Sequence, residues 1–452
     1  MTRLIMKAAA LILLALGACA TASSRADEEG ERELFAETYD GITRFYIDVT
    51  SPERLTMAGL ARLSTIDPAL AIERDGDALA LRLGRGVHLL RLPESEEGGP
   101  WAELTVAALT AARGLSPAVA RLSEDALDTL VIEGATTTLD RFSRYAAPDI
   151  AGDRRASRDG YGGIGVTLDL GSGAVRITSV QQGGPADSAG LRPEDRILGI
   201  DGVSTAGIAR EEVVRRLRGA AGSRVLLAIG RASREGALTI RITRTLITVP
   251  TVAMSESDGI ATLKIDGFNQ QTAASLSDTL DLVHREMGAN LRGILLDLRG
   301  NPGGLLDQSI DVADHFLDGL PVVSTIGRHP QSQQNYTAPI HENAETVPMV
   351  VLVNGGSASA AEVVAAALQD TGRAVVLGSA SYGKGTVQTV LPLPNGGELT
   401  VTWARLIPPA GYLLHEHGVV PTVCTSRMAA STGVEDAIRH NVELAQTLAE
   451  PR

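Results

Sequence analysis

The sequence predicts an α+β protein of several domains, the last of which is an α/β domain. Its 452 residues suffice for two or three domains with separate cores. The apolar pattern also changes along the chain. Helical spacing dominates at 31–66 and 101–146, strands dominate from 161 to 246, and strands alternate with helices from 249 onward. Such alternation is typical of an α/β domain.

The composition excludes some classes of partner. The net charge of -13 argues against nucleic acid or an anionic membrane surface as the main partner. The histidines and the two cysteines form no cluster at metal-ligand spacing, and we interpret His415-Glu416-His417 as an exposed loop rather than a zinc site. We therefore expect no metal and no cofactor.

The first residues indicate export. Arg3 and Lys7 precede an apolar run, Ala8 to Leu16, that is too short for a permanent membrane span. The run ends in Leu16-Gly17-Ala18-Cys19, which resembles a bacterial lipobox. Residues 1–18 would then be a lipoprotein-type signal peptide, with Cys19 lipidated.

The fate of this segment has two interpretations, signal cleavage alone or cleavage with lipidation of Cys19. One is ordinary signal cleavage beside Cys19 without lipidation. In the lipoprotein interpretation, residues 19–30 form a tether on the periplasmic side of a bacterial envelope. Because Ala20 rather than Asp follows the cysteine, the outer membrane is favoured.

Residues 31–157 form the predicted N-terminal domain, which is mostly helical. Its first helix carries the core-facing stripe Phe35, Tyr39, Ile42 and Phe45. Residues 68–98 have a turn signal at Asp75-Gly76 and alternating apolar residues around it, and so predict a small β element. The polar, glycine-flanked stretch 152–160 is interpreted as a linker.

Glycine-rich and apolar motifs follow in a characteristic order over 158–247. The segment opens with Gly163, Ile164, Gly165 and Val166, and continues with Gly184-Pro185-Ala186, Ala189-Gly190-Leu191, Asp195-Arg196-Ile197-Leu198 and Ile200-Asp201-Gly202. This order resembles the PDZ domains fused to bacterial proteases. The resemblance implies that a peptide adds as a strand, and that N–H groups of the opening loop hold its terminal carboxylate.

The α/β part has a serine at the start of a predicted helix, a position that suits a nucleophile. A buried strand ends at Val353, a glycine turn follows, and Ser357 and Ser359 stand at the start of a predicted helix. Free N–H groups there could stabilise an oxyanion. A serine needs a base, and a desolvated lysine such as Lys384, in a Gly-Lys-Gly turn, can serve when neutral. Taken singly, either serine could be only a helix cap, and we interpret Ser357 as one.

The two segments together resemble the C-terminal processing peptidases, also called tail-specific proteases. The first is Asn354-Gly355-Gly356-Ser357-Ala358-Ser359-Ala360-Ala361-Glu362, and the second is Tyr382-Gly383-Lys384-Gly385-Thr386-Val387-Gln388. The resemblance implies Ser359 as nucleophile, Lys384 as general base, Gln388 as the residue that orients the lysine, and Glu362 as a supporting acid. Ala361 replaces a serine common in the family.

Further motifs extend the resemblance over residues 160–425. Leu296-Asp297-Leu298-Arg299-Gly300-Asn301-Pro302-Gly303-Gly304 resembles the family's oxyanion loop. It implies that the N–H of Gly303 or Gly304 acts with that of Ala360. Upstream, Leu139-Asp140-Arg141-Phe142-Ser143-Arg144-Tyr145 resembles the family's Leu-Asp-Pro-His-Ser-x-Tyr stretch but has Arg-Phe for Pro-His. The β element at 68–98 has no counterpart in the family pattern.

The resemblance implies an α/β spiral-like catalytic domain at 248–452 with an inserted PDZ domain. The expected function is an exported serine endopeptidase that recognises protein or peptide substrates with apolar C-termini. An adaptor lipoprotein is a possible further partner, nucleic acid is not expected, and membrane contact is expected only through the lipid anchor. The alternatives are a catalytically silent PDZ adaptor and a non-protease hydrolase with the same Ser–Lys chemistry, such as a lipoprotein- or peptidoglycan-linked amidase.

Overall fold

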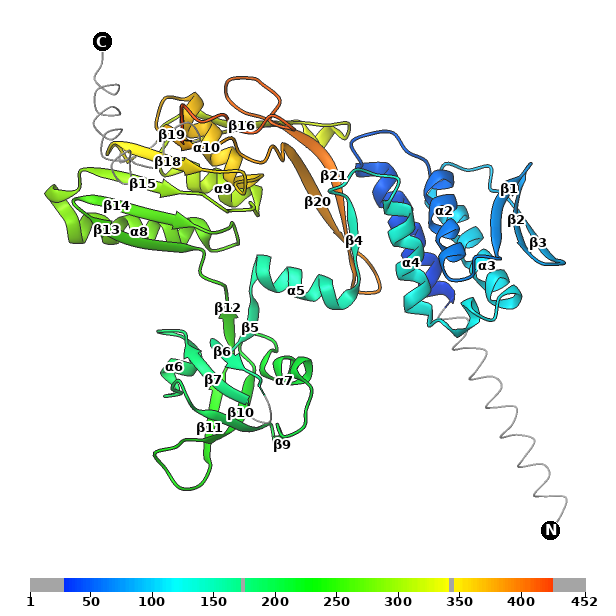
Figure 1. Ribbon diagram of the computed structural model, residues 1–452, viewed down its shortest axis with the longest axis horizontal. Coiled ribbons are helices and arrows are strands. Elements are labelled where there is room, and N and C mark those ends of the chain that lie inside the picture. Colours follow the sequence, from blue (N-terminus) through cyan, green and yellow to red (C-terminus); the bar gives the residue numbers. More distant parts are fainter. Residues whose placement is uncertain (1–27, 172–174, 341–344, 426–452) are drawn as a thin grey trace. The chain divides into compact units, whose positions relative to one another are not determined.

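The computed structural model describes residues 28–171, 175–340 and 345–425, and the chain divides into two compact units (Figure 1). The first unit comprises residues 1–152, 323–336 and 384–417. The second comprises residues 153–322, 337–383 and 418–452. Cys19 lies outside the described residues. Within those residues, no helix has the length and apolar character needed to cross a membrane.

Helices form most of the first unit. A helix over 28–45 buries Phe35, Tyr39 and Ile42 completely, which confirms most of the predicted stripe, while Phe45 is half-buried and packs on His329. Ser51 and Ser123 cap the helices that follow them by accepting backbone N–H bonds. The other helices are α2 (Pro52–Ala61), η1 (Arg62–Thr65), α3 (Gly98–Leu115), η2 (Val119–Arg121) and α4 (Glu124–Thr136).

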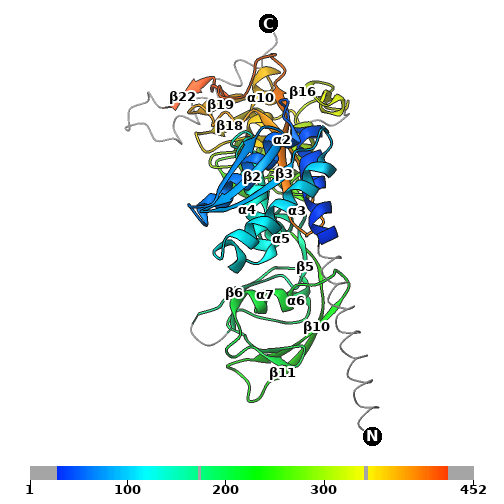
Figure 2. The same ribbon diagram turned by 90° about the vertical axis from the view of Figure 1, so that its right-hand side faces the viewer.

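The predicted β element is a three-stranded antiparallel sheet beside these helices (Figure 2). Its strands are β1 (Ala71–Asp75), β2 (Ala78–Leu83) and β3 (Gly86–Arg91). Gly76 and Gly84 stand in the two tight turns with positive φ, a conformation that glycine adopts without strain. The central strand buries Leu79 and Leu81 in the core of the unit.

A second sheet in this unit brings distant segments together in the order β17-β16-β21-β20, with β4 paired to β21. Leu393, Leu399 and Val401, from its long hairpin, share one core with the N-terminal helices. The unit is therefore built from both ends of the described chain. The elements are β4 (Arg144–Ala146), β16 (Pro321–Ile326), η4 (Pro330–Ser332), β17 (Gln334–Thr337), β20 (Thr386–Pro392) and β21 (Glu398–Ile407).

The PDZ-like segment forms a sheet of its own in the second unit, in the order β11-β10-β8-β7-β6 with β9 paired to β8. A short ladder joins β5 to β12, and an apolar cluster that includes Ile177, Ile200 and Leu227 fills the interior. The elements are β5 (Tyr161–Gly163), β6 (Val166–Asp169), β7 (Val175–Val180), α6 (Pro185–Ser188), β8 (Arg196–Ile200), β9 (Val203–Ser204), α7 (Arg210–Leu217), β10 (Arg224–Gly230), β11 (Leu238–Thr243) and β12 (Thr245–Ile247).

The interpretation of 152–160 as a linker is wrong. All of these residues except Gly160 belong to helix α5 (Pro148–Asp159), which starts at a proline, a residue well suited to a first helical turn. Ala151 and Ala156 are buried by it. The small side chains of this face gave no strong apolar period, so the polar residues between them resembled a loop.

The α/β part forms a six-stranded sheet in the order β13-β14-β15-β18-β19-β22, parallel from β14 onward. Because parallel strands end at the same edge, the loops after β15 and β18 lie side by side. The α+β, multidomain fold class is confirmed. The elements are β13 (Val252–Ser257), β14 (Ile260–Ile265), α8 (Thr272–Met287), η3 (Gly288–Asn290), β15 (Gly293–Asp297), α9 (Leu306–Asp314), β18 (Met349–Val353), α10 (Ala360–Asp370), β19 (Val375–Gly378) and β22 (Val423–Cys424).

Candidate active site

Ser359 occupies a strained position directly before helix α10. Its φ of 57° and ψ of -116° lie outside the regions that residues with a Cβ ordinarily adopt. Such a conformation costs about 1–3 kcal/mol and persists only where its surroundings hold it. One restraint is the Glu362 carboxylate, whose Oε2 accepts a 2.7 Å hydrogen bond from the Ser359 N–H.

Ser357 does not have the role that we predicted. Its side chain is fully buried, and its Oγ donates to the Leu298 carbonyl at 2.8 Å and accepts from the Asn354 N–H at 3.0 Å. The interpretation of Ser357 as the helix cap is therefore wrong, because Ser359 holds the N-cap position. Ser357 instead ties the glycine turn to the segment after β15.

Glu362 links the start of α10 to the segment before Lys384. Its buried carboxylate accepts at Oε1 from the Ser381 hydroxyl at 2.5 Å and from the Gly383 N–H at 2.6 Å. The same Ser381 hydroxyl accepts from the Val419 N–H at 2.7 Å. One carboxylate thus fixes both the backbone of Ser359 and the residue that directly precedes Lys384.

The glycine loop after β15 packs against the serine. A Cβ on Gly303 would lie 2.8 Å from the Ser359 Cβ and 3.0 Å from the Ala360 nitrogen, so only glycine fits. Gly303 donates its N–H to Asn301 Oδ1 at 2.8 Å. Gly304, with φ of 149°, donates in none of the loop and turn hydrogen bonds of the described residues.

A charged pair anchors the other end of this loop. Asp297, at the end of β15, is bound by the Arg299 guanidinium at 2.7 and 2.8 Å. Burial acts to raise the pKa of the Asp297 carboxyl, but its hydrogen bonds with Arg299 outweigh this effect and hold the pKa below its usual range. The pair stays ionised at neutral pH and fixes the loop at its start.

Lys384 and Gln388 belong to the first unit. The Lys384 side chain is half-buried, and its Nζ lies 5.3 Å from the centroid of the Phe142 ring, within the range of a cation–π contact. The Arg141 guanidinium lies 4.7 Å from the same ring, and His415 meets the ring edge-on at 6.1 Å. An aromatic ring from the N-terminal part of the chain therefore supports the lysine.

The glycine after Lys384 and the glutamine on β20 are also held tightly. A Cβ on Gly385 would lie 2.1 Å from the His415 nitrogen, so the close approach of these backbones requires glycine. Gln388 Nε2 donates to Thr386 Oγ1 at 2.9 Å and to Thr402 Oγ1 at 3.2 Å. Both bonds use the amide nitrogen of Gln388, so its side-chain carbonyl oxygen is the atom that could accept a hydrogen bond from a lysine.

The opening loop of the PDZ-like segment has the features of an anion-binding turn. Gly165 has φ of 73°, and the carbonyls of Ile164 and Gly165 accept bonds from Ala186 and Gln181 on one side of the loop. Among the described residues, the N–H groups of Ile164 and Gly165 take part in none of the loop and turn hydrogen bonds. They remain able to bind a carboxylate.

Two contacts of the site were not predicted. Phe142 was noted only as a departure from the family's Pro-His, and that departure was the signal that could have drawn attention to it. Ser381 carries no motif signal, because its bond to Glu362 appears only once the segment before Lys384 is folded.

Family models match both functional parts of the chain. The model of peptidase family S41 matches residues 259–425, and a PDZ domain model matches residues 176–231. These matches fall within the predicted catalytic and PDZ domains.

Curated proteases are similar to this chain over about two thirds of their own length. The chain is 37% identical over 294 residues to a carboxy-terminal-processing protease of Bartonella bacilliformis, covering 65% of this chain and 68% of that protein. It is 35% identical to the carboxyl-terminal-processing protease of Synechocystis, covering 64% and 69%. A solved photosystem II D1 C-terminal processing protease matches with a TM-score of 0.45 at 25% identity, over 87% of this chain and 92% of that one.

The Bartonella relative is 37% identical over about two thirds of its length, and the S41 match includes the segments that hold Gly303, Ser359 and Lys384. The chain therefore belongs to the carboxy-terminal-processing proteases of peptidase family S41 and is a serine protease with a PDZ domain.

Proposed function

We propose that Ser359 and Lys384 form the catalytic dyad of this protease. The observation that carries the proposal is the position of Glu362, which binds the N–H of Ser359 and the N–H of Gly383 with one carboxylate. The Glu362 carboxylate thereby holds both the backbone of Ser359 and the backbone directly before Lys384. The strained Ser359 backbone supports the assignment, because such strain clusters at functional sites.

In the proposed reaction, neutral Lys384 accepts the proton of the Ser359 hydroxyl, and Oγ attacks the scissile carbonyl carbon. The C–N bond then breaks, and the lysine returns the proton to the leaving amine. Water, activated by the same lysine, releases the acyl group from Ser359. Gln388 orients the lysine through its free carbonyl oxygen.

The oxyanion of the tetrahedral intermediate needs backbone donors. Ala360 supplies one, because its N–H belongs to the first turn of α10, whose N–H groups have no partner within the helix. Gly304 supplies the other in our proposal, since Gly303 already donates to Asn301. The bond from Gly303 to Asn301 favours Gly304 between the two glycines that the sequence left open.

Substrates reach this site through the PDZ domain in our proposal. Its carboxylate loop, formed by Gly163, Ile164, Gly165 and Val166, would hold the C-terminus of an unstructured protein with an apolar last residue. We further propose that Cys19 is lipidated and that residues 19–30 tether the enzyme on the periplasmic side of the outer membrane. An adaptor lipoprotein would then be a partner on the same surface.

The test is cleavage of an unstructured protein with an apolar C-terminus by residues 20–452, with Ser359→Ala and Lys384→Ala compared side by side. Wild type is expected to cleave, and both variants are expected to lose at least about a hundredfold in rate. Equal cleavage by all three would refute the dyad. Binding without cleavage by wild type would favour the catalytically silent adaptor.

A further inference from the structure

The edge of the PDZ sheet offers a defined groove for a peptide. Strand β6 lies at the edge of its sheet and pairs only with β7 among the described strands. A cavity of about 300 Å³ lies between β6 and helix α7. It is lined by Tyr161, Gly163, Ile164, Gly165, Val166, Thr167, Leu168, Leu170, Arg210, Val214, Leu217 and Arg218.

The direction of a bound peptide follows from the ends of these two elements. Strand β6 begins at the carboxylate loop, so a peptide whose C-terminus reaches the loop must run antiparallel to β6. Helix α7 ends beside the same loop, because Gly219, two residues past its end, donates its N–H to the Gly162 carbonyl at 2.9 Å. Arg210, the first residue of α7, therefore lies at the far end of the groove.

Strand and helix spacing then place the peptide's side chains. Successive residues of a strand point to opposite faces, so the last residue and the residue two before it both point into the groove, about 7 Å apart. Arg210 lies seven residues, about 10 Å along the helix, from Leu217. The last residue thus meets Leu217 and its apolar neighbours, while the second residue before it lies within reach of the Arg210 side chain.

The lining residues carry positive charge only. Arg210 is exposed and forms no hydrogen bond or ion pair with any other described residue. Arg218 lies 4.4 Å from the Tyr161 ring and donates to Asp153 at 3.2 Å, so its charge is partly compensated. On the same helix, Glu212 pairs with Arg215 and Arg216, and Glu211 is not among the residues that line the cavity.

From this geometry, and resting on the proposed PDZ recognition of C-termini, we propose that Arg210 selects substrates with an acidic side chain two residues before an apolar C-terminal residue. The carboxylate loop and Leu217 hold the last residue. Arg210 then forms a charge-assisted hydrogen bond with Asp or Glu at the second position before it. The enzyme would thereby distinguish among the many proteins that end in an apolar residue.

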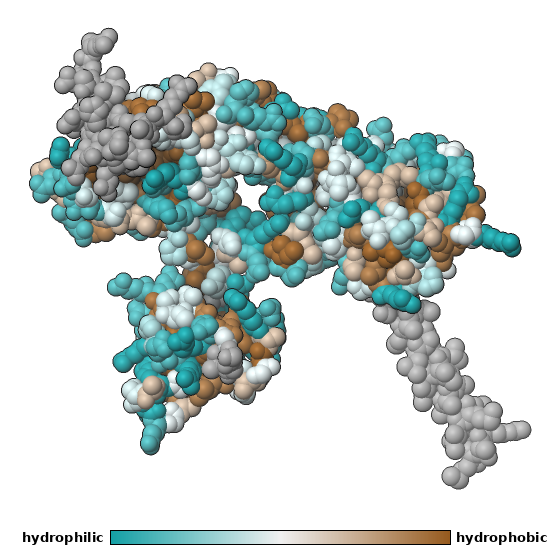
Figure 3. Space-filling model, in the orientation of Figure 1, coloured by the Kyte–Doolittle hydropathy of each residue, from teal (hydrophilic) through white to brown (hydrophobic). Residues whose placement is uncertain are grey.

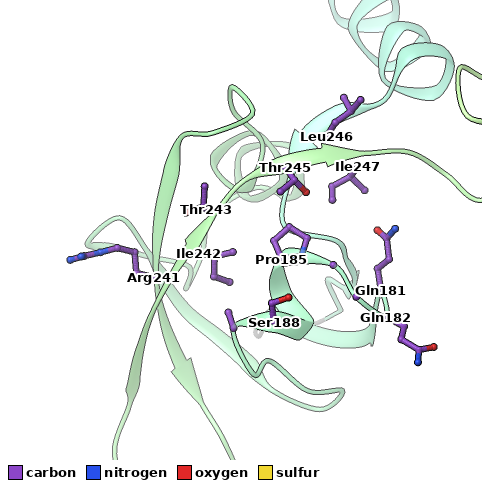
Figure 4. Close-up of a pocket in the computed structure, with 13 residues that line it drawn as sticks. Gln181, Gln182, Pro185, Ser188, Arg241, Ile242, Thr243, Thr245, Leu246 and Ile247 are labelled. Atoms are coloured by element: carbon purple, nitrogen blue, oxygen red, sulfur yellow. The ribbon is translucent and has the colours of Figure 1, made fainter.

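The domain also supplies a matched control. A second cavity, of about 590 Å³, lies between the segment 181–189 and strands β11 and β12 and shares no lining residue with the groove (Figure 4). Arg241 stands at its rim and extends away from the other lining side chains (Figure 4). Arg241 is exposed like Arg210, so Arg241→Glu makes the same charge change on the same domain outside the groove.

The experiment measures peptide binding by fluorescence anisotropy to the full chain carrying Ser359→Ala, so that cleavage does not interfere. The labelled peptides are ten residues long, end in valine, and differ only in having Asp, Asn or Lys at the second position before it. The Asp peptide is expected to bind about 3- to 10-fold more tightly than its Asn isostere. Arg210→Gln should abolish this preference, and Arg210→Glu should transfer it to the Lys peptide.

The outcomes separate this inference from the function on which it rests. Arg241→Glu should leave the Asp preference unchanged, and a peptide with a C-terminal amide should lose binding in every variant. Equal binding of the three peptides, with the amide still excluded, would overturn the role of Arg210 and keep the PDZ function. A preference that survives Arg210→Glu would overturn it as well. Binding that ignores the terminal carboxylate would overturn both.

Discussion

At the scale of the residue, the proposed base is shaped by a neighbour that no family motif contains. Phe142 contacts Lys384, and it stands where the family pattern has histidine. An aromatic ring in this place cannot exchange a proton with the lysine, so it acts through position and polarity alone. We therefore expect this ring to help orient the Lys384 amine.

Replacement of Phe142 tests this dependence. Phe142→Leu keeps an apolar side chain but removes the ring face, and kcat is expected to fall about 2- to 30-fold with little change in KM. Phe142→Tyr keeps the ring and should retain most of the activity. The measurement is steady-state peptide cleavage across pH 6–9, with tryptophan fluorescence as the check on folding. A change in KM alone would argue that Phe142 contacts the substrate instead.

Asp128 is a second residue whose environment has a measurable consequence. It lies on α4, is 6% exposed, and its Oδ1 has no hydrogen-bond partner among the described residues. Burial, with the nearby charges of Glu31 and Asp125, raises the pKa of the Asp128 carboxyl to about 7. The folded state therefore favours the neutral acid, and the ionised form destabilises it.

The sign of the pH effect follows from linkage. A carboxyl whose pKa is raised on folding loses its contribution to stability as pH rises from about 4 through about 7. Asp128→Asn should remove this loss, so the variant should gain about 3–4 kcal/mol over wild type between pH 4 and pH 8. Urea unfolding followed by tryptophan fluorescence reports this unit, because Trp101 and Trp403 both belong to it. Glu133→Gln, an exposed position on the same helix whose charge does not act on Asp128, should show no such trend.

At the scale of the element, the sequence predicts best where the apolar period is strong. Helix α8 lies in the stretch from 249 onward where strands were predicted to alternate with helices, and the strand that ends at Val353 lies where predicted because its five residues are all buried. Helix α5 was missed because its buried face consists of alanines, which give little contrast with polar neighbours. The hydrogen bond between Ser381 and Glu362 could not be predicted from the local sequence either, because the two residues come together only when the chain folds.

On the surface, too, the residue type alone does not identify a functional site. Figure 3 shows hydrophobic side chains scattered among hydrophilic ones on the face in view. Exposed apolar residues such as Val87 and Leu89 on β3 therefore do not by themselves mark a site. The groove beside β6 was recognised instead from an open strand edge together with Arg210, which forms no ion pair within the described part of the chain.

At the scale of the whole molecule, the two units do not follow the linear order of the predicted domains. The PDZ-like sheet and the α/β sheet fall in one unit, whereas the hairpin β20–β21 falls with the N-terminal helices. The proposed nucleophile lies in the second unit, and the proposed base is the first residue of a segment of the first. The domain boundaries at 157/158 and 247/248 thus remain predictions from the sequence.

This interleaving makes the N-terminal part of the chain a support for the segment that carries the proposed base and Gln388. Strand β4 pairs with β21, the Ser143 hydroxyl accepts the Thr402 N–H at 3.0 Å, and Thr402 in turn binds Gln388. A chain that begins at residue 148 lacks these supports and exposes Leu399 and Val401, which the helices bury. It is expected to lose cleavage of the unstructured test protein and protection of the β21 amides against hydrogen exchange.

The same truncation should leave peptide binding intact, because the groove beside β6 lies wholly in the second unit. Loss of cleavage with retained binding of a C-terminal peptide would show that the N-terminal helices support the lysine side of the site and not substrate capture. Full activity of the truncated chain would refute this view, since Lys384 and Gln388 would then keep their positions without Phe142 and Ser143. Loss of both functions would mean that the second unit depends on the first to fold.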